Sequence, residues 1–154
     1  MARIELEMLV KAPPAACYAL ALNVQAHLHS TRQTGERVLA GPASGQLQLG
    51  DVVTWEARHF GIRQRLTVKI TAATPPHHFR DELVRGAFKT LRHDHYFEAV
   101  EGGTRMRDVF EFSSPFGIIG RLVDRLFLRR YLTSFLQTRN AALKEALDLS
   151  TAQG

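Results

Sequence analysis

Residues 104–147 read TRMRDVFEFSSPFGIIGRLVDRLFLRRYLTSFLQTRNAALKEAL, and the spacing of the apolar residues changes in the middle of this stretch. Up to Phe112, polar and apolar side chains alternate, as they do in a strand with one buried face. Pro115 and Gly117 then interrupt the alternation, and both residue types are typical of a break between elements. From Ile118 onward the apolar residues recur every three or four positions, which predicts a helix over residues 118–147.

The helical period assigns two faces to this segment. One face carries arginines at every fourth position and is expected to be solvated: Arg121, Arg125 and Arg129. The other face is apolar and is expected to pack against a sheet; it comprises Leu122, Leu126, Phe127, Leu132, Phe135, Leu136, Leu143 and Leu147.

Upstream of this stretch, glycine and proline residues divide the chain into short extended segments. Gly61, Gly86 and the pair Gly102-Gly103 separate them, and Pro75-Pro76 makes a further break. Strands at this spacing, joined by glycine turns, form an antiparallel meander. The expected strands cover residues 51–59, 62–72, 79–85, 88–99 and 104–112.

The N-terminal part adds one strand and two short helices. Residues 3–10 alternate as a half-buried strand, and Pro13-Pro14 ends it and opens a helix over 15–22. A second short helix is expected over 24–30, followed by a weak strand centred on Val38. The order of elements predicts an α+β fold in which a curved antiparallel sheet of six to seven strands wraps around the long C-terminal helix.

Composition and charge narrow the class of protein. At 154 residues, with no linker, repeat or low-complexity segment, the chain fits one domain over 1–149, followed by a frayed tail over 150–154. The single cysteine, Cys17, cannot form an internal disulfide, and no secretory signal or membrane-spanning stretch is recognised, so a cytoplasmic location is expected. The net charge of +5 comes mostly from dispersed arginines without a nucleic-acid motif, so no nucleic-acid partner is expected.

Six segments carry a resemblance to a known superfamily: GDVVTW (50–55), FGIR (60–63), FRDE (79–82), GAFK (86–89), HDHYFE (93–98) and GTRMRD (103–108). With these residues the sequence resembles the START/polyketide-cyclase/birch-pollen-allergen superfamily, and more narrowly its small bacterial cyclase/dehydrase-like members. The resemblance covers nearly the whole chain and implies the helix-grip fold. It leaves the function open, because the superfamily includes lipid carriers, hormone receptors and cyclases.

Strand alternation predicts which side chains face the cavity of such a fold. The concave face is expected to be mostly apolar with a few polar exceptions, and His59 is expected near its rim. The expected ligand-binding residues are Trp55, Gln64, Leu66, Asp81, Leu83, His93, His95, Phe97, Asp108 and Phe110.

The two inward histidines allow three interpretations. Because His93 and His95 are two positions apart on a strand, their side chains point the same way, toward Asp81 or Asp108. Buried polar groups need partners, so a satisfied structural network is the interpretation that the sequence favours. An acid–base pair and a metal site with an open position remain alternatives. No metal or other cofactor is predicted.

The other candidate site residues are weaker. His27 and His29 are expected in a helix, where side chains two positions apart point in different directions, so they are not expected to bind a metal together. His77 and His78 are expected in an exposed loop. Cys17 is expected to be a small core residue.

Three functions therefore compete. The first is a carrier or sensor that binds a small hydrophobic molecule, as a monomer or homodimer. The second is a cyclase or dehydrase that uses the histidines and aspartates. The third is an interaction module whose basic helix face contacts a membrane or an acidic protein. The sequence favours the first, because it contains no phosphate-binding loop, nucleophile–base pair or strong metal motif.

Overall fold

The meander predicted from the glycine turns forms one sheet in the computed structural model, which describes residues 1–153 and the side chains of residues 1–151. All seven strands pair antiparallel in the order β1-β7-β6-β5-β4-β3-β2. β1 leaves the meander and pairs with β7, so that Ala2 lies opposite Phe112. The strands are β1 (Ala2–Val10), β2 (Arg37–Ala40), β3 (Val52–His59), β4 (Ile62–Thr74), β5 (His78–Arg85), β6 (Thr90–Val100) and β7 (Gly103–Ser113).

The turn between β3 and β4 contains a strained residue. Phe60 and Gly61 both have positive φ, 55° and 74°, as the tight two-residue turn of a hairpin requires. Glycine adopts this conformation freely, whereas a phenylalanine there is unusual.

Two short helices and a 3₁₀ turn close one end of the sheet. They are α1 (Pro14–Leu22), α2 (Val24–Ser30) and η1 (Arg32–Thr34). Asn23 ends α1 and caps α2, because its side chain accepts a hydrogen bond from the Ala26 N–H at 2.9 Å. Cys17 is fully buried in this region, as expected of a core residue.

The C-terminal helix is longer than expected and is interrupted. It consists of α3 (Gly117–Val123), a π-helical turn η2 (Asp124–Leu128) and α4 (Arg129–Gln153). Residues 150–153 therefore belong to the helix, where a frayed tail was expected, and residue 154 lies outside the described residues. In η2, Asp124 is buried and accepts hydrogen bonds from the Ser114 N–H, at 2.9 Å, and from the Ser114 hydroxyl. The π-turn thus anchors the helix to the loop that follows β7.

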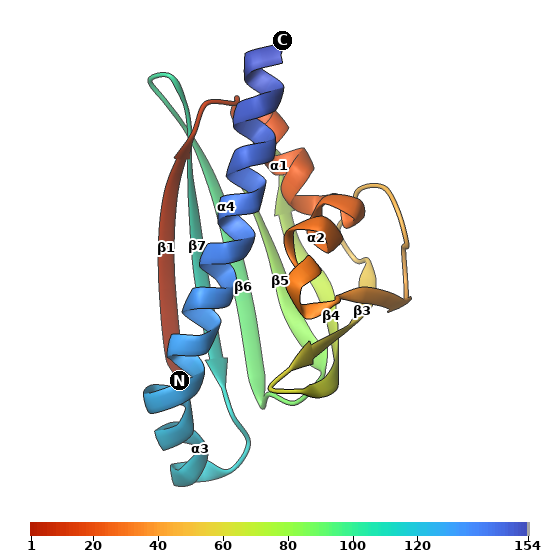
Figure 1. The fold of residues 1–154 in the computed structure, drawn as a ribbon, viewed down its shortest axis with the longest axis vertical. Helices are drawn as coiled ribbons and strands as arrows, with labels where there is room; N and C mark the ends of the chain where they lie inside the picture. The colour runs from red at the N-terminus through yellow and green to blue at the C-terminus, as the bar shows by residue number, and fades with distance from the viewer. Residues whose placement is uncertain (154) are drawn as a thin grey trace.

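The apolar face predicted for this helix is correct for α4 and wrong for its first turns. Leu136, Leu143 and Leu147 are buried, and Leu132 and Phe135 are partly buried. The other three predicted residues are exposed: Leu122 at 57%, Leu126 at 67% and Phe127 at 57%. The reason is that the first turns of the helix lie beyond the ends of the strands, below them in Figure 1, where no sheet is available to cover them.

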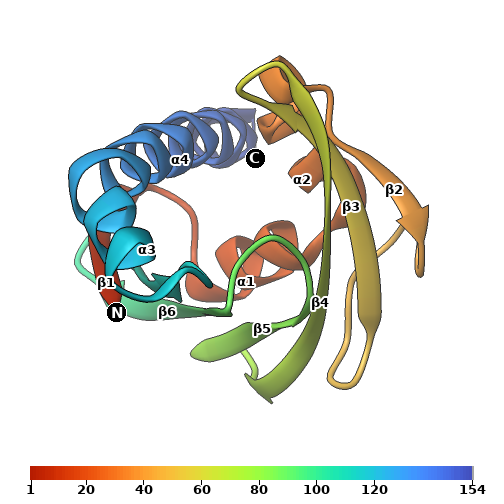
Figure 2. The ribbon, with the colours of Figure 1, turned by 90° about the horizontal axis from the view of Figure 1, so that it is seen from below.

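The sheet curves around α4, which lies along its open side (Figure 2). The N-terminal strand and the C-terminal helix also pack together, and Lys144 Nζ donates to the Leu9 carbonyl at 2.9 Å. This arrangement confirms the predicted helix-grip fold. Among the described residues, no helix combines the length and the apolar character that a bilayer span requires.

Candidate functional site

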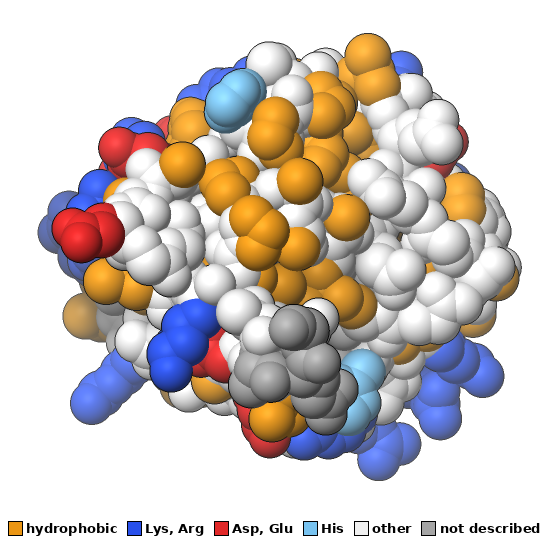
Figure 3. Space-filling view, turned by 90° about the horizontal axis from the view of Figure 1, so that it is seen from above, with side chains coloured by type: hydrophobic (Ala, Val, Ile, Leu, Met, Phe, Trp, Pro, Cys, Tyr) orange, Lys and Arg blue, Asp and Glu red, His pale blue; other side chains and the backbone are white. Residues whose placement is uncertain are grey.

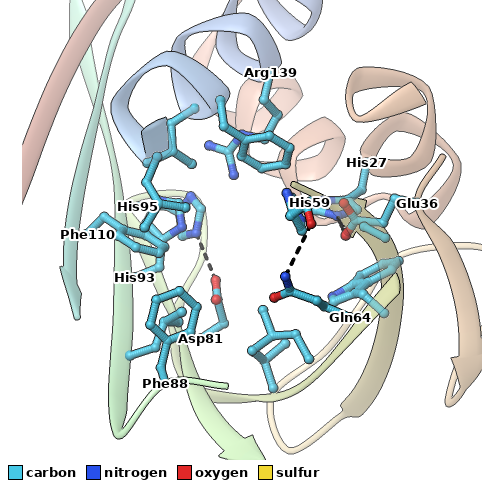
Figure 4. A pocket seen from close by; sticks show the side chains of 18 of the residues that line it. His27, Glu36, His59, Gln64, Asp81, Phe88, His93, His95, Phe110 and Arg139 are labelled. Atoms are coloured by element: carbon cyan, nitrogen blue, oxygen red, sulfur yellow. Dashed lines mark hydrogen bonds and ion pairs between the residues drawn. The ribbon is translucent and has the colours of Figure 1, made fainter. Parts of the chain in front are cut away.

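A cavity of about 200 Å³ lies between the concave face of the sheet and the C-terminal helix. An apolar cavity of about 150 Å³ can hold a molecule of the size of benzene, so this one has room for a small ligand. Seven of the expected ligand-binding residues line its wall, as strand alternation predicted: Trp55, Gln64, Leu66, Asp81, His93, His95 and Phe110. Figure 4 labels five of them: Gln64, Asp81, His93, His95 and Phe110.

Three expected residues do not line the cavity. Phe97 lies further along β6, under α1, where its ring contacts Tyr18 with centroids 5.5 Å apart. Leu83 is partly buried among the apolar residues around Phe110 and Leu136. Asp108 is buried behind the histidines. Alternation predicts the face that a residue occupies, but the extent of the cavity along each strand depends on which helix covers it.

The wall also contains residues that the strand pattern did not identify. From α4 these include Tyr131, Phe135 and Arg139, and from the N-terminal region they include His27 and Glu36. Only Arg139 was signalled by the sequence, because it interrupts the apolar face between Leu136 and Leu143. A cation on a buried helix face requires a buried anion as its partner.

That anion is Asp108, the centre of a buried network. Asp108 Oδ1 lies 2.8 Å from His93 Nε2, 3.2 Å from His95 Nδ1 and 3.2 Å from Arg139 Nη2. Asp108 Oδ2 accepts from Asn140 Nδ2 at 2.7 Å. On the other side, His95 Nε2 lies 2.9 Å from Asp81 Oδ2. The network therefore joins three strands to α4.

The hydrogen-bond network around Asp108 favours the charged form of His95. Burial raises the pKa of Asp81 and Asp108, but the histidine bonds and Arg139 outweigh it, so both pKa values are lowered and both groups are ionised. Burial likewise opposes charge on His95, yet its bonds to Asp108 and Asp81 raise its pKa. These surroundings favour the protonated ring of His95, whose Nε2 lies 2.9 Å from Asp81 Oδ2 and whose Nδ1 lies 3.2 Å from Asp108 Oδ1.

The pKa of His93, two residues earlier, is shifted in the opposite direction. Burial, followed by repulsion from His95, lowers the pKa of His93 to about 4; the two rings stack with centroids 3.7 Å apart. Because Asp108 is ionised, the proton of the neutral ring lies on Nε2, and Nδ1 carries a lone pair. Nδ1 has no hydrogen-bond partner among the described residues, although every fully enclosed side-chain nitrogen there has one. Nδ1 is therefore open to the cavity as an acceptor.

The opposite wall carries a second polar group of residues (Figure 4). His27 Nε2 lies 2.7 Å from Glu36 Oε1, and the His27 ring stacks on Trp55 with centroids 4.2 Å apart. His59 Nδ1 lies 2.6 Å from the Tyr131 hydroxyl. Burial lowers the pKa of His59.

The other histidine predictions have mixed outcomes. His77 is exposed, as expected, and His27 and His29 lie in the predicted helix α2. His78 was expected in an exposed loop, but it begins β5 and its Nε2 lies 2.7 Å from Asp94 Oδ1. The prediction was wrong because β5 begins one residue earlier than its pattern indicated.

Asp81, His93 and His95 also satisfy the spacing of a metal site, since one ligand atom of each lies within 4.8 Å of the others. A metal ion would have to replace the hydrogen bond that joins His95 Nε2 to Asp81 Oδ2. The geometry therefore fits the structural network better than it fits a cation.

Fold and cavity together define the class of helix-grip proteins, in which a curved sheet and a long helix enclose an internal cavity. The chain belongs to the family described as polyketide cyclase / dehydrase and lipid transport, whose model matches residues 1–148. Membership implies a role in binding, transporting or cyclising hydrophobic ligands.

Solved structures show the same fold at low sequence identity. A protein from Thermus thermophilus is 17% identical with a TM-score of 0.78, over 97% of this chain and 99% of that chain. A START superfamily protein from Mycobacterium smegmatis is 11% identical with a TM-score of 0.72, over 96% and 97%. The major latex-like protein 151 of Panax ginseng is 14% identical with a TM-score of 0.70, over 95% and 97%. No curated protein matches the chain significantly.

Proposed function

We propose that the protein binds a small, mostly apolar and uncharged molecule in this cavity, as a carrier or sensor. The observation that carries the proposal is the cavity itself, with a mostly apolar wall and a few polar groups that converge on it. The family description, which includes lipid transport, supports the same function.

The polar groups indicate which ligand would fit. His93 Nδ1 offers a lone pair, so the ligand should carry a hydrogen-bond donor such as a hydroxyl group. Asp81 is paired with His95 and Asp108 with Arg139, so a charged ligand would find no unpaired counter-charge in this wall.

A low pKa at His93 argues for binding rather than catalysis. A general base works best when its pKa lies near the working pH, and a ring with a pKa of about 4 is a weak base at neutral pH. In His95, Nε2 is bonded to Asp81 and Nδ1 lies 3.2 Å from Asp108 Oδ1. The cyclase or dehydrase alternative would therefore need a different acid–base group.

A matched pair of probes tests the proposal. Calorimetric titration should show 1-naphthol binding more tightly than 1-methylnaphthalene, by about fivefold for one neutral hydrogen bond. In His93→Leu the two probes should bind equally, with melting curves recorded to verify that the variant is folded. Native mass spectrometry of the purified protein should show a retained apolar molecule.

Binding of neither probe, together with no retained molecule, would contradict the carrier function. Equal binding of both probes to the unaltered protein would contradict the role of His93. A retained metal ion lost on substitution of Asp81, His93 or His95 would make the cluster a metal site.

A further inference from the structure

The turns that precede α4 expose an unusual number of large apolar side chains. We define the α3 surface by the exposed residues of this segment, where the exposed fractions range from 41% to 78%: Phe116, Ile118, Ile119, Leu122, Val123, Leu126 and Phe127. A contiguous apolar patch of this kind marks an interaction site in most proteins. The opposite end of the molecule, seen in Figure 3, also shows hydrophobic side chains near its middle.

The same segment is strongly basic. Arg121, Arg125, Arg129 and Arg130 are exposed, and none of them belongs to a salt bridge among the described residues. The only carboxylate between residues 116 and 130 is Asp124, which is buried and bonded to Ser114. No exposed acidic group of the segment offsets the four cations.

The α3 surface is continuous with the mouth of the cavity. The phenyl ring of Phe60, in the β3–β4 turn, contacts Phe127 and Tyr131, with ring centroids 5.5 Å and 4.4 Å apart. Phe60 and Tyr131 also line the cavity, and Phe60 is 49% exposed, whereas Trp55 and His93 deeper in the wall are buried. The cavity therefore opens beside this surface.

We propose that the α3 surface docks on anionic phospholipid membranes and brings the mouth of the cavity to the bilayer. Large apolar side chains flanked by arginines are the composition of a helix that lies in the membrane interface. A second copy of the chain is a poorer partner, because it would present the same unpaired cations. Docking does not depend on the ligand proposed above, so the two proposals can fail separately.

Vesicle co-sedimentation of the full chain tests this assignment. Binding is expected to phosphatidylcholine vesicles that contain phosphatidylserine, to be far weaker with phosphatidylcholine alone, and to decrease at high salt. Because each arginine at an anionic surface changes the binding constant about fivefold, Arg125→Gln with Arg129→Gln should weaken binding about 25-fold. Ile119→Ser with Leu126→Ser should weaken it about tenfold or more.

Matched controls lie elsewhere on the surface. Leu49, in the loop between β2 and β3, is 61% exposed and closely matches Leu126, while Lys69 is an exposed cation on β4. Leu49→Ser and Lys69→Gln should leave vesicle binding unchanged. Equal loss in these controls, or equal binding to neutral and anionic vesicles, would overturn the proposal.

Sedimentation velocity tests the other possible partner, a second copy of the chain. The α3 surface would instead be a contact between copies if the protein formed a dimer without vesicles and did not bind anionic vesicles. In that case Ile119→Ser with Leu126→Ser should abolish the dimer. A monomer that binds anionic vesicles supports docking.

Discussion

The pKa values of His93 and His95 are shifted in opposite directions although the two residues lie two positions apart on one strand. The difference arises from their partners, because His95 lies between two carboxylates while His93 reaches only one. A neutral ring with a free nitrogen therefore lies beside a ring whose surroundings favour protonation.

The low pKa of His93 predicts a loss of stability in mild acid. Below pH 6.5 the ring takes up a proton in the unfolded chain, whereas in the folded protein it stays neutral until about pH 4. The unfolded state binds more protons over this interval, so the free energy of unfolding should fall as the pH is lowered. The interval from 6.5 to about 4 corresponds to about 3 kcal/mol.

Urea titrations between pH 7 and 4 measure this effect. His93→Gln keeps an N–H donor for Asp108 but cannot titrate, so its stability should decline less than that of the unaltered protein. His77→Gln, at an exposed histidine, should behave as the unaltered protein does. Parallel curves for His93→Gln and the unaltered protein would show that His93 does not resist protonation.

At this scale the sequence could predict where side chains point but not their charge. Strand alternation placed His93, His95 and Asp81 in the wall correctly. The charge of Asp108 depends on Arg139, which reaches it from a helix more than thirty positions away. No local pattern contains that contact.

The β3–β4 turn holds a phenylalanine in a conformation that suits glycine or asparagine. Its side chain stands at the cavity mouth against Phe127 and Tyr131, and strained residues of this kind are often found at functional positions. The strain is therefore consistent with selection of Phe60 for its contacts.

Substitution of Phe60 separates the strain from the contacts. Phe60→Asn loses the contacts but relieves the backbone, whereas Phe60→Ala loses the contacts and keeps the strain. We expect Phe60→Asn to be more stable than Phe60→Ala by about 1 kcal/mol, and both variants to bind 1-naphthol less tightly. Chemical denaturation and calorimetry measure the two quantities. An alanine variant as stable as the asparagine variant would show that the turn is not strained.

The sequence predicted the type of each element better than it predicted what surrounds the element. The change of period after Phe112 correctly predicted a strand and then a helix. It did not predict that α3 would extend past the sheet, because the helical period records which residues share a face and not what lies opposite that face.

Two apolar clusters form the interior of the molecule, and they are connected. One includes Val53, Phe97 and Leu147, and the other includes Phe110 and Leu136. Leu66 packs against both clusters, and α4 contributes to each. The cavity therefore lies in a continuous core, in keeping with the single domain over 1–149 that we propose.

This continuity predicts one cooperative unfolding transition. Trp55 is the only tryptophan and is buried in the cavity wall, so its fluorescence reports the cavity, while far-ultraviolet circular dichroism reports the whole backbone. The two signals should change at the same urea concentration. A fluorescence change that precedes the loss of circular dichroism would mean that the cavity opens as a separate unit.

The pairing of the two chain ends has a consequence for synthesis. β1 finds its partner only when β7 has been made, and the helix that completes the cavity is made after all seven strands. A growing chain therefore exposes its concave surface for most of translation, when a chaperone has the greatest opportunity to bind it. The cavity is closed only after the chain has been released as far as Arg139, the last residue of its wall.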